Sequence, residues 1–519
     1  MDPGYLPEDS IFNRSVTKKE EVKMTENEAA SNTDVPKKSN AKTLGIISLA
    51  MINVAAVLSL RNFPTMAMEG WNMIFWYVLF TVCFLIPTAL VAAELASTWP
   101  KSGGIYSWVK EAYPKEGSFI TIWCSWVNNL VWFPTVVSFF AATVAYILLS
   151  PFLSDNPVFM AVVMLACFWA VTIFNFFGTR ASNTLATVGT AFGSLIPVGI
   201  LVALMIVWVA DGNPSAIGDF TLNSLIPHFN LSTITFAASM ILMFAGMEMA
   251  GYHARETENP KRDYPIAMFL AAAIICIVSI VGTLAVALVV PAEKIALNAG
   301  IVQTFQIMFT ELNVSWLIIP ISIMLAVGIL AQLSVWVVGP ARGMIPAAMT
   351  GDLPPIFRKM NKYGMPIGVL IIQGVISSVF ALAMVLVPSI NEGYWILTAI
   401  TSLVNAVMYM FMFAAFIKLR KIKANVNRPY KVQGGVVGMW IVAGLAFAAL
   451  FFSFGIGLLP SGTSYDLTET ILYMAGMLIA VLLIILLPPY LLQKFRKPSW
   501  KPSEKEYHDW YCEEHVCEE

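Results

Sequence analysis

The chain has 519 residues, of which 58% are hydrophobic and only 12% charged, and its formal net charge is −1. With a mean hydropathy of +0.73, this composition excludes a soluble globular protein, because too few polar residues are present to cover so large an apolar core. No basic tract suggests a nucleic-acid partner, and the net charge by itself is uninformative. The hydrophobic composition makes a lipid bilayer the expected surroundings of most of the chain.

The N-terminal residues 1–43 are polar, rich in Lys, Glu and Asn, and poor in apolar residues. They contain none of the basic, apolar and small-residue regions that make up a cleaved signal peptide. We predict a disordered cytoplasmic N-terminal tail, after which the first membrane span serves as its own insertion signal.

About twelve apolar runs follow, and each is long enough to cross roughly 30 Å of hydrocarbon as a helix. The alternating pattern of a membrane β-barrel is absent, so we predict an all-α integral membrane protein. The expected spans are residues 44–67, 72–96, 118–150, 157–177, 183–210, 232–254, 265–290, 315–345, 367–388, 393–419, 436–459 and 467–493.

Lysine and arginine gather in the loops that follow even-numbered spans, as Lys101, Arg262, Lys362 and Arg420 illustrate. The loops after odd-numbered spans hold little besides Lys294. Because cytoplasmic loops retain basic residues, we predict a multi-pass protein of the plasma (inner) membrane with both termini in the cytoplasm.

The first span contains a break over residues 57–64, where Arg61 and Pro64 interrupt an otherwise featureless apolar run. Unwinding there would expose NH groups at the start of the outer half-helix, which bind a carboxylate. It would also expose carbonyls at the end of the inner half-helix, which bind an ammonium group. Alternatively, Arg61 extends its guanidinium to the headgroups at the outer interface.

The sixth span carries a second interruption, in which Gly246, Glu248 and Gly251 lie within an apolar run that ends in a basic loop. A carboxylate in hydrocarbon is unfavourable unless it faces protein or water, so Glu248 is a candidate site residue. The alternative is a structural role, in which Glu248 pairs with a basic residue or stays protonated and locks two helices together.

Spans 1–5 (residues 44–210) and spans 6–10 (residues 232–420) have similar lengths, and the first span of each half is the interrupted one. This organisation predicts two inverted repeats whose broken helices form a substrate site near the membrane midplane. Two further spans, over residues 436–493, and a cytoplasmic C-terminal tail, residues 494–519, complete the chain.

The C-terminal tail contains soft ligands at close spacing, His508, Cys512, His515 and Cys517. Zinc binding and sensing of cytoplasmic pH are both compatible with this pattern. A structural zinc site usually comes with a fold around it, so we expect no metal site and no cofactor.

Three motifs together resemble the amino acid-polyamine-organocation (APC) superfamily of permeases. They are Glu94 followed by residues 100–108, the segment 244–265, and the loop motifs 351–355 and 361–366. The resemblance covers residues 44 to about 490. It implies a five-plus-five inverted-repeat core with two helices outside it, and alternating access by rocking of a bundle that includes the broken helices.

By position, the resemblance implies that backbone carbonyls of both breaks hold the ammonium group of the substrate and that NH groups of residues 58–61 hold its carboxylate. The carbonyls are those of Ala55, Leu242 and Ala245. Trp336 falls where some members place a gating tryptophan, although it could equally be a packing aromatic. The expected substrate-binding residues are Ala55, Val57, Leu58, Ser59, Leu60, Arg61, Leu242, Phe244, Ala245, Gly246, Glu248 and Trp336.

The Gly-Ser-Gly that the family usually places in its first helix is replaced here by Val57, Leu58 and Ser59. This replacement looks more like the glutamate:GABA antiporter branch than the arginine or cationic branches. The resemblance therefore implies a secondary active transporter that exchanges an amino acid for an amine or for another amino acid. A proton-coupled symporter of neutral amino acids, working through Glu248, and an ion channel are the alternatives. An enzyme is not expected, because the chain has only four histidines and two lie in the tail.

Overall fold

The structure is a computed structural model that describes residues 44–101, 103–114, 116–227, 240–387, 390–460 and 466–515. Within these ranges the backbone forms helices joined by turns, and the strand-like pairing found there is an isolated bridge between Leu44 and Thr257. The all-α prediction is confirmed for the described residues. The predicted N-terminal tail, residues 1–43, lies outside them.

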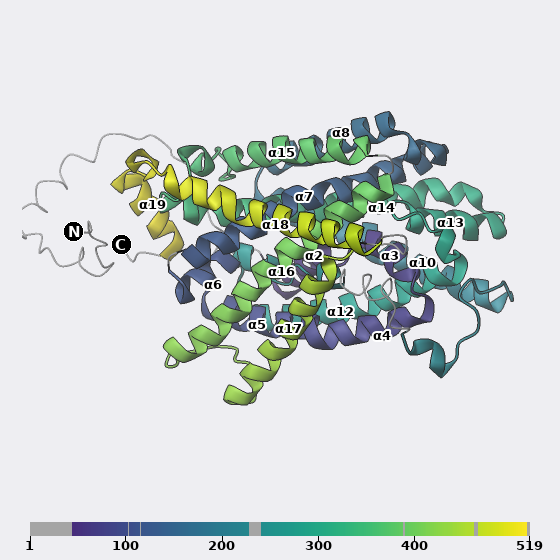
Figure 1. Cartoon of the computed structure of the whole chain (residues 1–519), viewed down its shortest axis with the longest axis horizontal. Coiled ribbons are helices and arrows are strands. Elements are labelled where there is room, and N and C mark those ends of the chain that lie inside the picture. The colour runs from purple at the N-terminus through teal and green to yellow at the C-terminus, as the bar shows by residue number, and fades with distance from the viewer. Residues whose placement is uncertain are drawn as a thin grey trace, which may run out of the picture. The chain divides into compact units, whose positions relative to one another are not determined.

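Eleven helical segments of the described chain are long and apolar enough to cross a membrane, so this is a multi-pass membrane protein (Figure 1). The sixth expected span, 232–254, is described only from residue 240 onward. The spans are formed by α2 (Ile46–Val57) with α3 (Phe63–Ala67), α4 (Met73–Phe80) with α5 (Ile86–Thr98), α7 (Glu116–Ile147), α8 (Pro157–Asn175), α9 (Thr179–Thr190) with α10 (Ile196–Ala210), α12 (Pro260–Val289), α14 (Ile318–Met349), α15 (Ile367–Leu386), α16 (Ile390–Ile422), α17 (Gly435–Gly457) and α18 (Leu467–Lys494).

The sequence pattern missed three shorter helices, α6 (Ile105–Ala112), α13 (Gly300–Glu311) and α19 (Glu504–His515). They have 8, 12 and 12 residues, so none is long enough to cross a bilayer, and a search for apolar runs passes over them. The pattern also missed two π-helical turns, Thr81–Leu85 and Ala191–Leu195, which join the helix pairs of the second and fifth spans.

The first span is broken at the predicted place. Helix α2 ends at Val57, Leu58 and Ser59 are extended, and a 3₁₀ turn over Leu60–Asn62 precedes α3. Pro64 occupies the start of α3, where its missing NH group costs no helical hydrogen bond. The extended pair therefore separates two half-helices within one membrane crossing.

The second break follows the helical residues 240–243. Gly246 has φ +123°, a backbone conformation that favours glycine, and a 3₁₀ segment over Met249–Glu256 then leads to α12. The interruption expected between residues 244 and 248 is present.

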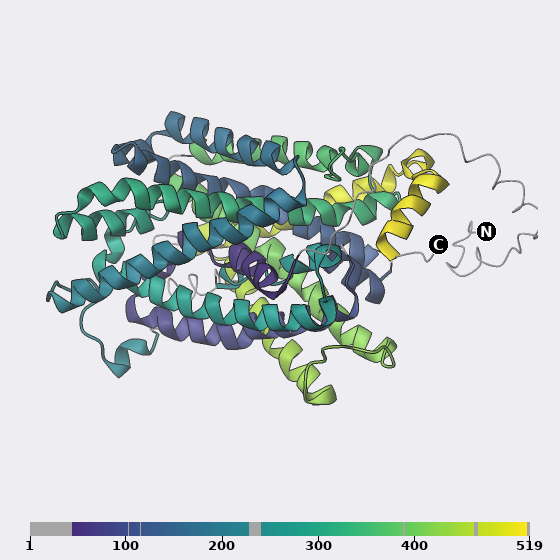
Figure 2. The same ribbon diagram turned by 180° about the vertical axis from the view of Figure 1, so that it is seen from behind.

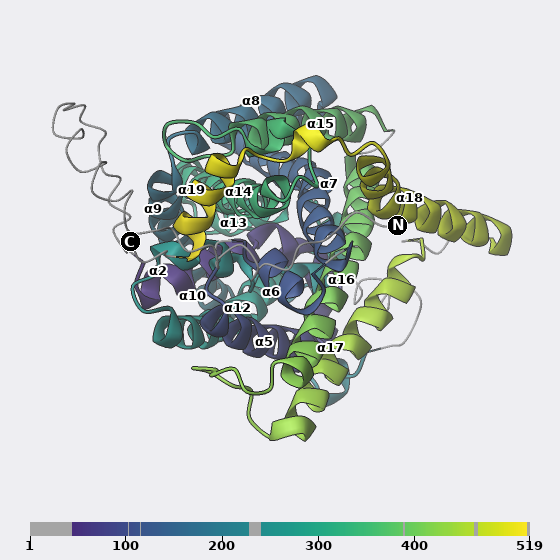
Figure 3. The same cartoon turned by 90° about the vertical axis from the view of Figure 1, so that its left-hand side faces the viewer.

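The burial of the spans separates an inner from an outer set of helices. In an apolar 18-residue stretch of each span, 83% of the residues are buried in α2 with α3 and likewise in α7, whereas only 17% are buried in α18. Viewed end-on, α17 and α18 lie at the edge of the bundle beside α16 (Figure 3). From behind, α12 in teal runs alongside α4 and α5 in purple (Figure 2). The broken first span thus lies inside the bundle, and α18 presents most of its surface outward.

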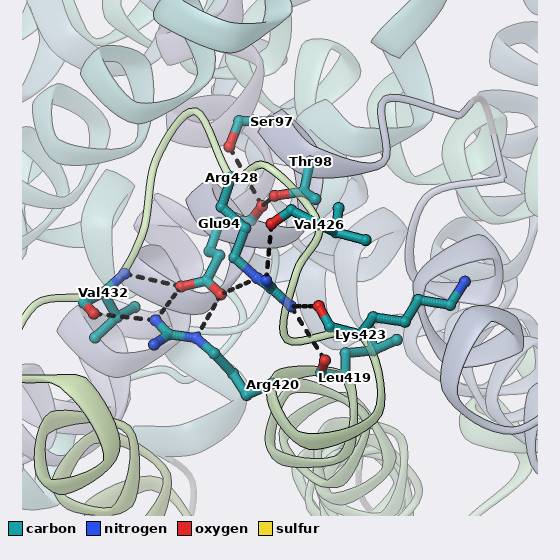
Figure 4. A network of polar contacts seen from close by, with 9 residues as sticks. All are labelled: Glu94, Ser97, Thr98, Leu419, Arg420, Lys423, Val426, Arg428 and Val432. Carbon is teal, nitrogen blue, oxygen red and sulfur yellow. Dashed lines mark hydrogen bonds and ion pairs between the residues drawn. The ribbon is translucent and has the colours of Figure 1, made fainter.

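A buried ion cluster joins the end of α5 to the end of α16 and to the loop between α16 and α17 (Figure 4). The Glu94 carboxylate is 1% exposed and accepts hydrogen bonds from Arg420 at 2.7 and 2.5 Å. It also accepts the NH group of Val432 at 2.8 Å and lies 3.1 Å from Nε of Arg428. Both carboxylate oxygens are therefore paired, which is the condition under which a buried charge is tolerated.

A second, more exposed ion pair lies nearby on α6. Burial disfavours the charged form of Glu111, but hydrogen bonds from Lys101 and Lys423 outweigh it and hold the pKa of this carboxyl below its ordinary value. A carboxyl whose pKa is lower in the folded than in the unfolded protein stabilises the fold when the pH lies above the unfolded-state pKa. This contribution is lost as the pH falls through the folded-state pKa. The pair is therefore intact at neutral pH.

The segment that follows α18 lies along the loop between α14 and α15. Arg496 donates to the carbonyls of Thr350 at 2.8 Å and Gly351 at 2.9 Å and pairs with Asp352 at 3.2 Å. Arg358 in turn pairs with Glu506 at 3.0 Å. These contacts hold the C-terminal segment against the loop.

Replacing Arg496 by alanine should release this segment, because three contacts to residues 350–352 depend on one side chain. We expect limited proteolysis after residue 494 to become about fivefold faster, the effect of roughly 1 kcal/mol on the docking equilibrium. Lys497→Ala, at an exposed neighbouring position, is the control. Equal cleavage rates in the two variants would show that Arg496 does not hold the segment.

Candidate functional site

The two broken segments lie against each other. The side-chain oxygen of Asn53 on α2 accepts the NH group of Ala250 at 3.2 Å. A Cβ atom at Gly246 would lie 3.1 Å from side-chain atoms of Ala56, Val57 and Trp336, so this position favours glycine for space as well as for its φ angle. The second break can therefore pack directly on the end of α2.

A small cavity lies at this meeting point. Its volume, counted over the positions that the centre of a water molecule can occupy, is about 10 Å³. This is room for about one water molecule. The lining comes from the first break, the second break, α7 and α14. Its residues are Ala56, Val57, Ser59, Arg61, Asn62, Asn128, Asn129, Trp132, Leu242, Ala245, Gln332 and Trp336.

Two side chains of α14 close the first break. The indole NH of Trp336 donates to the Ala56 carbonyl at 2.9 Å, and the Gln332 amide donates to the same oxygen at 3.4 Å. The Ser59 hydroxyl donates to Oε1 of Gln332 at 2.9 Å. The carbonyl that α2 leaves free at its end is thus paired with side chains rather than with helix backbone.

Arg61 is buried at the cavity wall, with 1% of its surface exposed. Its Nη1 donates to the hydroxyl of Tyr394 at 2.7 Å, and its guanidinium carbon lies 5.3 Å from the ring centre of Trp132. Its Nε has no hydrogen-bond partner, and within the described ranges no carboxylate forms an ion pair with it. The interpretation that Arg61 extends to the headgroups is wrong, because the side chain points into protein.

The site also contains unpaired acceptors. Asn128 and Asn129 on α7 are 2% and 1% exposed, and the side-chain oxygen of each has no hydrogen-bond partner in the described part of the chain. Both residues line the cavity with Arg61. The cavity wall therefore offers a cation that lacks an anion and two oxygens that lack donors, a combination suited to a ligand with both a carboxylate and an ammonium group.

Glu248 lies in the second break but does not line the cavity. Its side chain is fully buried, and its Oε2 accepts the hydroxyl of Tyr409 on α16 at 2.5 Å. The same hydroxyl accepts the NH group of Gly246 at 2.8 Å. The alternative that Glu248 pairs with a basic residue is wrong, since its partner is a tyrosine, whereas the alternative that it stays protonated and locks two helices together is not tested. Its Oε1 has no partner among the described residues.

The predicted site residues divide evenly. Six line the cavity: Val57, Ser59, Arg61, Leu242, Ala245 and Trp336. The other six, which lie nearby in the two breaks, do not line it: Ala55, Leu58, Leu60, Phe244, Gly246 and Glu248. The sequence interpretation missed Ala56, Asn62, Asn128, Asn129, Trp132 and Gln332. Two adjacent asparagines within the long apolar run of α7 were a signal that could have been used.

The described residues contain no group of three or more His, Cys, Asp or Glu side chains that could hold a metal ion. The side chain of His508 in the tail is exposed. The side chains of Cys512 and His515, and Cys517 altogether, lie outside the part of the chain that the structure describes, so the zinc hypothesis for the tail stays a hypothesis.

Comparison with known proteins places this architecture among membrane carriers. The family model described as amino acid permease matches residues 44–485. An uncharacterized transporter of Legionella pneumophila is 37% identical over 81% of this chain and 90% of its own length. A glutamate/gamma-aminobutyrate antiporter of Lactococcus lactis is 32% identical over 86% of this chain and 90% of its own length.

A more distant relative is named for amines. A probable agmatine/putrescine antiporter of Lactococcus lactis is 24% identical over 76% of this chain and 84% of its own length. The names of these two antiporters thus point to substrates of different charge. One name gives amino acids, which carry carboxylates, and the other gives polyamines, which do not. The charges of the cavity wall are the feature on which a choice between them can be based.

Proposed function

We propose that this chain, which belongs to the amino acid permease family of the APC superfamily, is an amino acid antiporter of the glutamate:GABA type. Its family makes it a transporter and not an enzyme. It exchanges an amino acid against an amine or another amino acid by alternating access. It works in the plasma (inner) membrane with both termini in the cytoplasm, and residues 44–210 and 232–420 are its two inverted repeats.

The observation that carries this proposal is the buried Arg61, which has no carboxylate partner among the described residues. A buried cation is unfavourable unless an anion pairs with it, so the cavity wall favours an anionic ligand group. Glutamate and GABA both carry a carboxylate that can bond the guanidinium through its free Nε. A bond between two charged groups is the strong class of hydrogen bond.

The same residue argues against a polyamine as substrate. Putrescine and agmatine carry no carboxylate, and their positive ends would meet a positive wall. Two like charges about 4 Å apart repel by about 4 kcal/mol at an effective dielectric constant of 20. The chain is therefore proposed to carry glutamate and GABA, the substrates named for the relative at 32% identity, and not agmatine or putrescine, those named for the relative at 24%.

The peptide groups of the two breaks are proposed to bind the zwitterionic head of the substrate. The carbonyls of Ala55, Leu242 and Ala245 face its ammonium group, and the NH groups of residues 59–61 face its carboxylate. The NH group of Leu58, which the sequence also predicted for the carboxylate, donates instead to the Val54 carbonyl at 2.8 Å. The unpaired side-chain oxygens of Asn128 and Asn129 offer further acceptors to an ammonium group.

Counterflow in proteoliposomes tests this function. Vesicles loaded with unlabelled glutamate or GABA should accumulate labelled glutamate, because a carrier exchanges one substrate for the other. Vesicles loaded with putrescine should not. Accumulation driven by putrescine would contradict the proposed substrate class, and equal labelled flux into empty vesicles would indicate a channel or a uniporter.

Proton symport is a second candidate, and the free Oε1 of the buried Glu248 favours it. A carboxyl placed beside the second break could take up and release a proton as the protein changes conformation. In that case an imposed pH gradient should drive net uptake without substrate on the other side, and Glu248→Gln should abolish that uptake while leaving exchange intact. Uptake that does not respond to the gradient would leave Glu248 with the structural role of holding Tyr409.

A further inference from the structure

We propose that Gln332 is an internal stand-in for the substrate. In the conformation that the structure describes, its carboxamide occupies the place of an amino acid's head group at the first break, and a substrate binds by displacing it. The inference rests on the proposed function, because it gives the same site to an amino acid. It makes Gln332 a residue that sets the affinity of the site by competition.

The size of the cavity is the first argument. Room for about one water cannot hold an amino acid, so some part of the wall must move before a substrate binds. Gln332 and Trp336 are the lining side chains that bond to the first break itself. A substrate that reaches the main chain there has to replace at least one of them.

The hydrogen bonds of the Gln332 amide are the second argument. Its oxygen accepts from Ser59, at the start of the outer half of the span, where a helix beginning favours negative charge. Its nitrogen donates to the Ala56 carbonyl, at the end of the inner half, where a helix end favours positive charge. The amide thus places an acceptor and a donor as a carboxylate and an ammonium group would be placed.

Displacing the Gln332 side chain from the first break costs little free energy because of its position on α14. Trp336, one helical turn further along, also donates to the Ala56 carbonyl, and its bond is the shorter of the two. When the glutamine leaves, this carbonyl keeps a donor. Only the Ser59 hydroxyl then needs a new acceptor, which the substrate carboxylate supplies. The nearby free oxygens of Asn128 and Asn129 can accept an amide or ammonium donor.

A residue that competes with the substrate has an unusual signature, because its removal should tighten binding. We expect the Kd of labelled glutamate for purified protein to fall about 2- to 10-fold in Gln332→Leu, the effect of about one net hydrogen bond. Gln332→Met, which keeps the length and flexibility of the side chain, should do the same and guards against a folding defect of the leucine variant.

Gln373→Leu is the matched control, because Gln373 is a buried glutamine on α15 that donates to the Val337 carbonyl at 3.1 Å and does not line the cavity. Its Kd should stay at the wild-type value. Unchanged or weaker binding in the folded Gln332 variants would overturn the inference, since a glutamine that contacts or merely supports the substrate weakens binding when it is lost.

The two proposals fail in different ways. If the wild type binds another of the twenty amino acids but not glutamate, the glutamate:GABA function is wrong, and the ratio of Kd values for that amino acid still decides the role of Gln332. Wild-type protein that binds none of the twenty would overturn both proposals.

Discussion

Replacing Arg61 by methionine should lower glutamate counterflow about 10- to 100-fold, the loss expected when one charge-assisted hydrogen bond to a substrate carboxylate disappears. The same variant should be at least as stable to heat as the wild type, because it removes a buried cation that has no ion-pair partner among the described residues. Loss of transport without loss of stability is the combination that identifies a ligand-binding charge.

Two comparisons sharpen this prediction. Arg61→Lys keeps the charge but not the planar fork of donors, so it should retain part of the glutamate flux. Saturating glutamate should raise the Tm of the wild type and leave that of Arg61→Met nearly unchanged, because only the former binds it tightly. If Arg61→Met transports glutamate as fast as the wild type does, Arg61 does not bind a substrate carboxylate.

Replacing Glu94 by glutamine should destabilise the fold by about 3–5 kcal/mol, the usual effect of removing one partner from a buried ion pair. The carboxylate pairs with Arg420 and Arg428, and both arginines would lose their counter-charge at once. We expect a large drop in the Tm measured by size-exclusion chromatography of heated samples, and a low yield of folded protein.

The matched control is Glu111→Gln, at a half-buried carboxylate that also bonds two basic side chains. Lys101 and Lys423 are 31% and 36% exposed, so solvent screens these pairs and the loss should stay below about 1 kcal/mol. In Glu94→Gln, replacing Arg420 by methionine as well should restore part of the stability. Equal Tm values for the two single variants would mean that the Glu94 cluster contributes no more than a surface pair.

Helix α16 connects the features discussed above. Tyr394 bonds Arg61 of the first break, Tyr409 bonds Glu248 of the second, and Arg420 bonds Glu94 of α5. These contacts are distributed along most of one 33-residue helix. A shift of α16 relative to the broken spans would therefore alter both breaks and the Glu94 cluster together, which is a property expected of a helix involved in alternating access.

Much of the fold follows from local features of the chain. Apolar runs predicted the membrane helices, because a segment of sufficient length and hydropathy inserts as a helix whatever its neighbours are. The two breaks were predicted as well, because Pro64 restricts the backbone locally and Gly246 permits a backbone conformation that other residues avoid. The helices α6 and α13 were missed because they are too short to produce an apolar run of membrane length.

The candidate site was predicted only in part. Five predicted residues of the two breaks line the cavity, and the sixth predicted lining residue, Trp336 on α14, came from the family resemblance. Asn128, Asn129 and Gln332 lie on helices that are not interrupted at those positions, so no helix break marks them, although the two adjacent asparagines stand out in an apolar run. Their role at the cavity depends on which face of α7 and α14 turns inward.

The sequence by itself determined that this is an all-α membrane protein with two interrupted spans, because helix formation and its interruption depend on residues close together in the chain. Only the tertiary structure decided that Gln332 bonds Ser59 across 273 residues, that Arg61 bonds Tyr394 across 333, and that Glu248 bonds Tyr409 across 161. Such contacts depend on the rotation and axial position of whole packed helices. These follow from the sum of many weak packing interactions, which no single stretch of sequence contains.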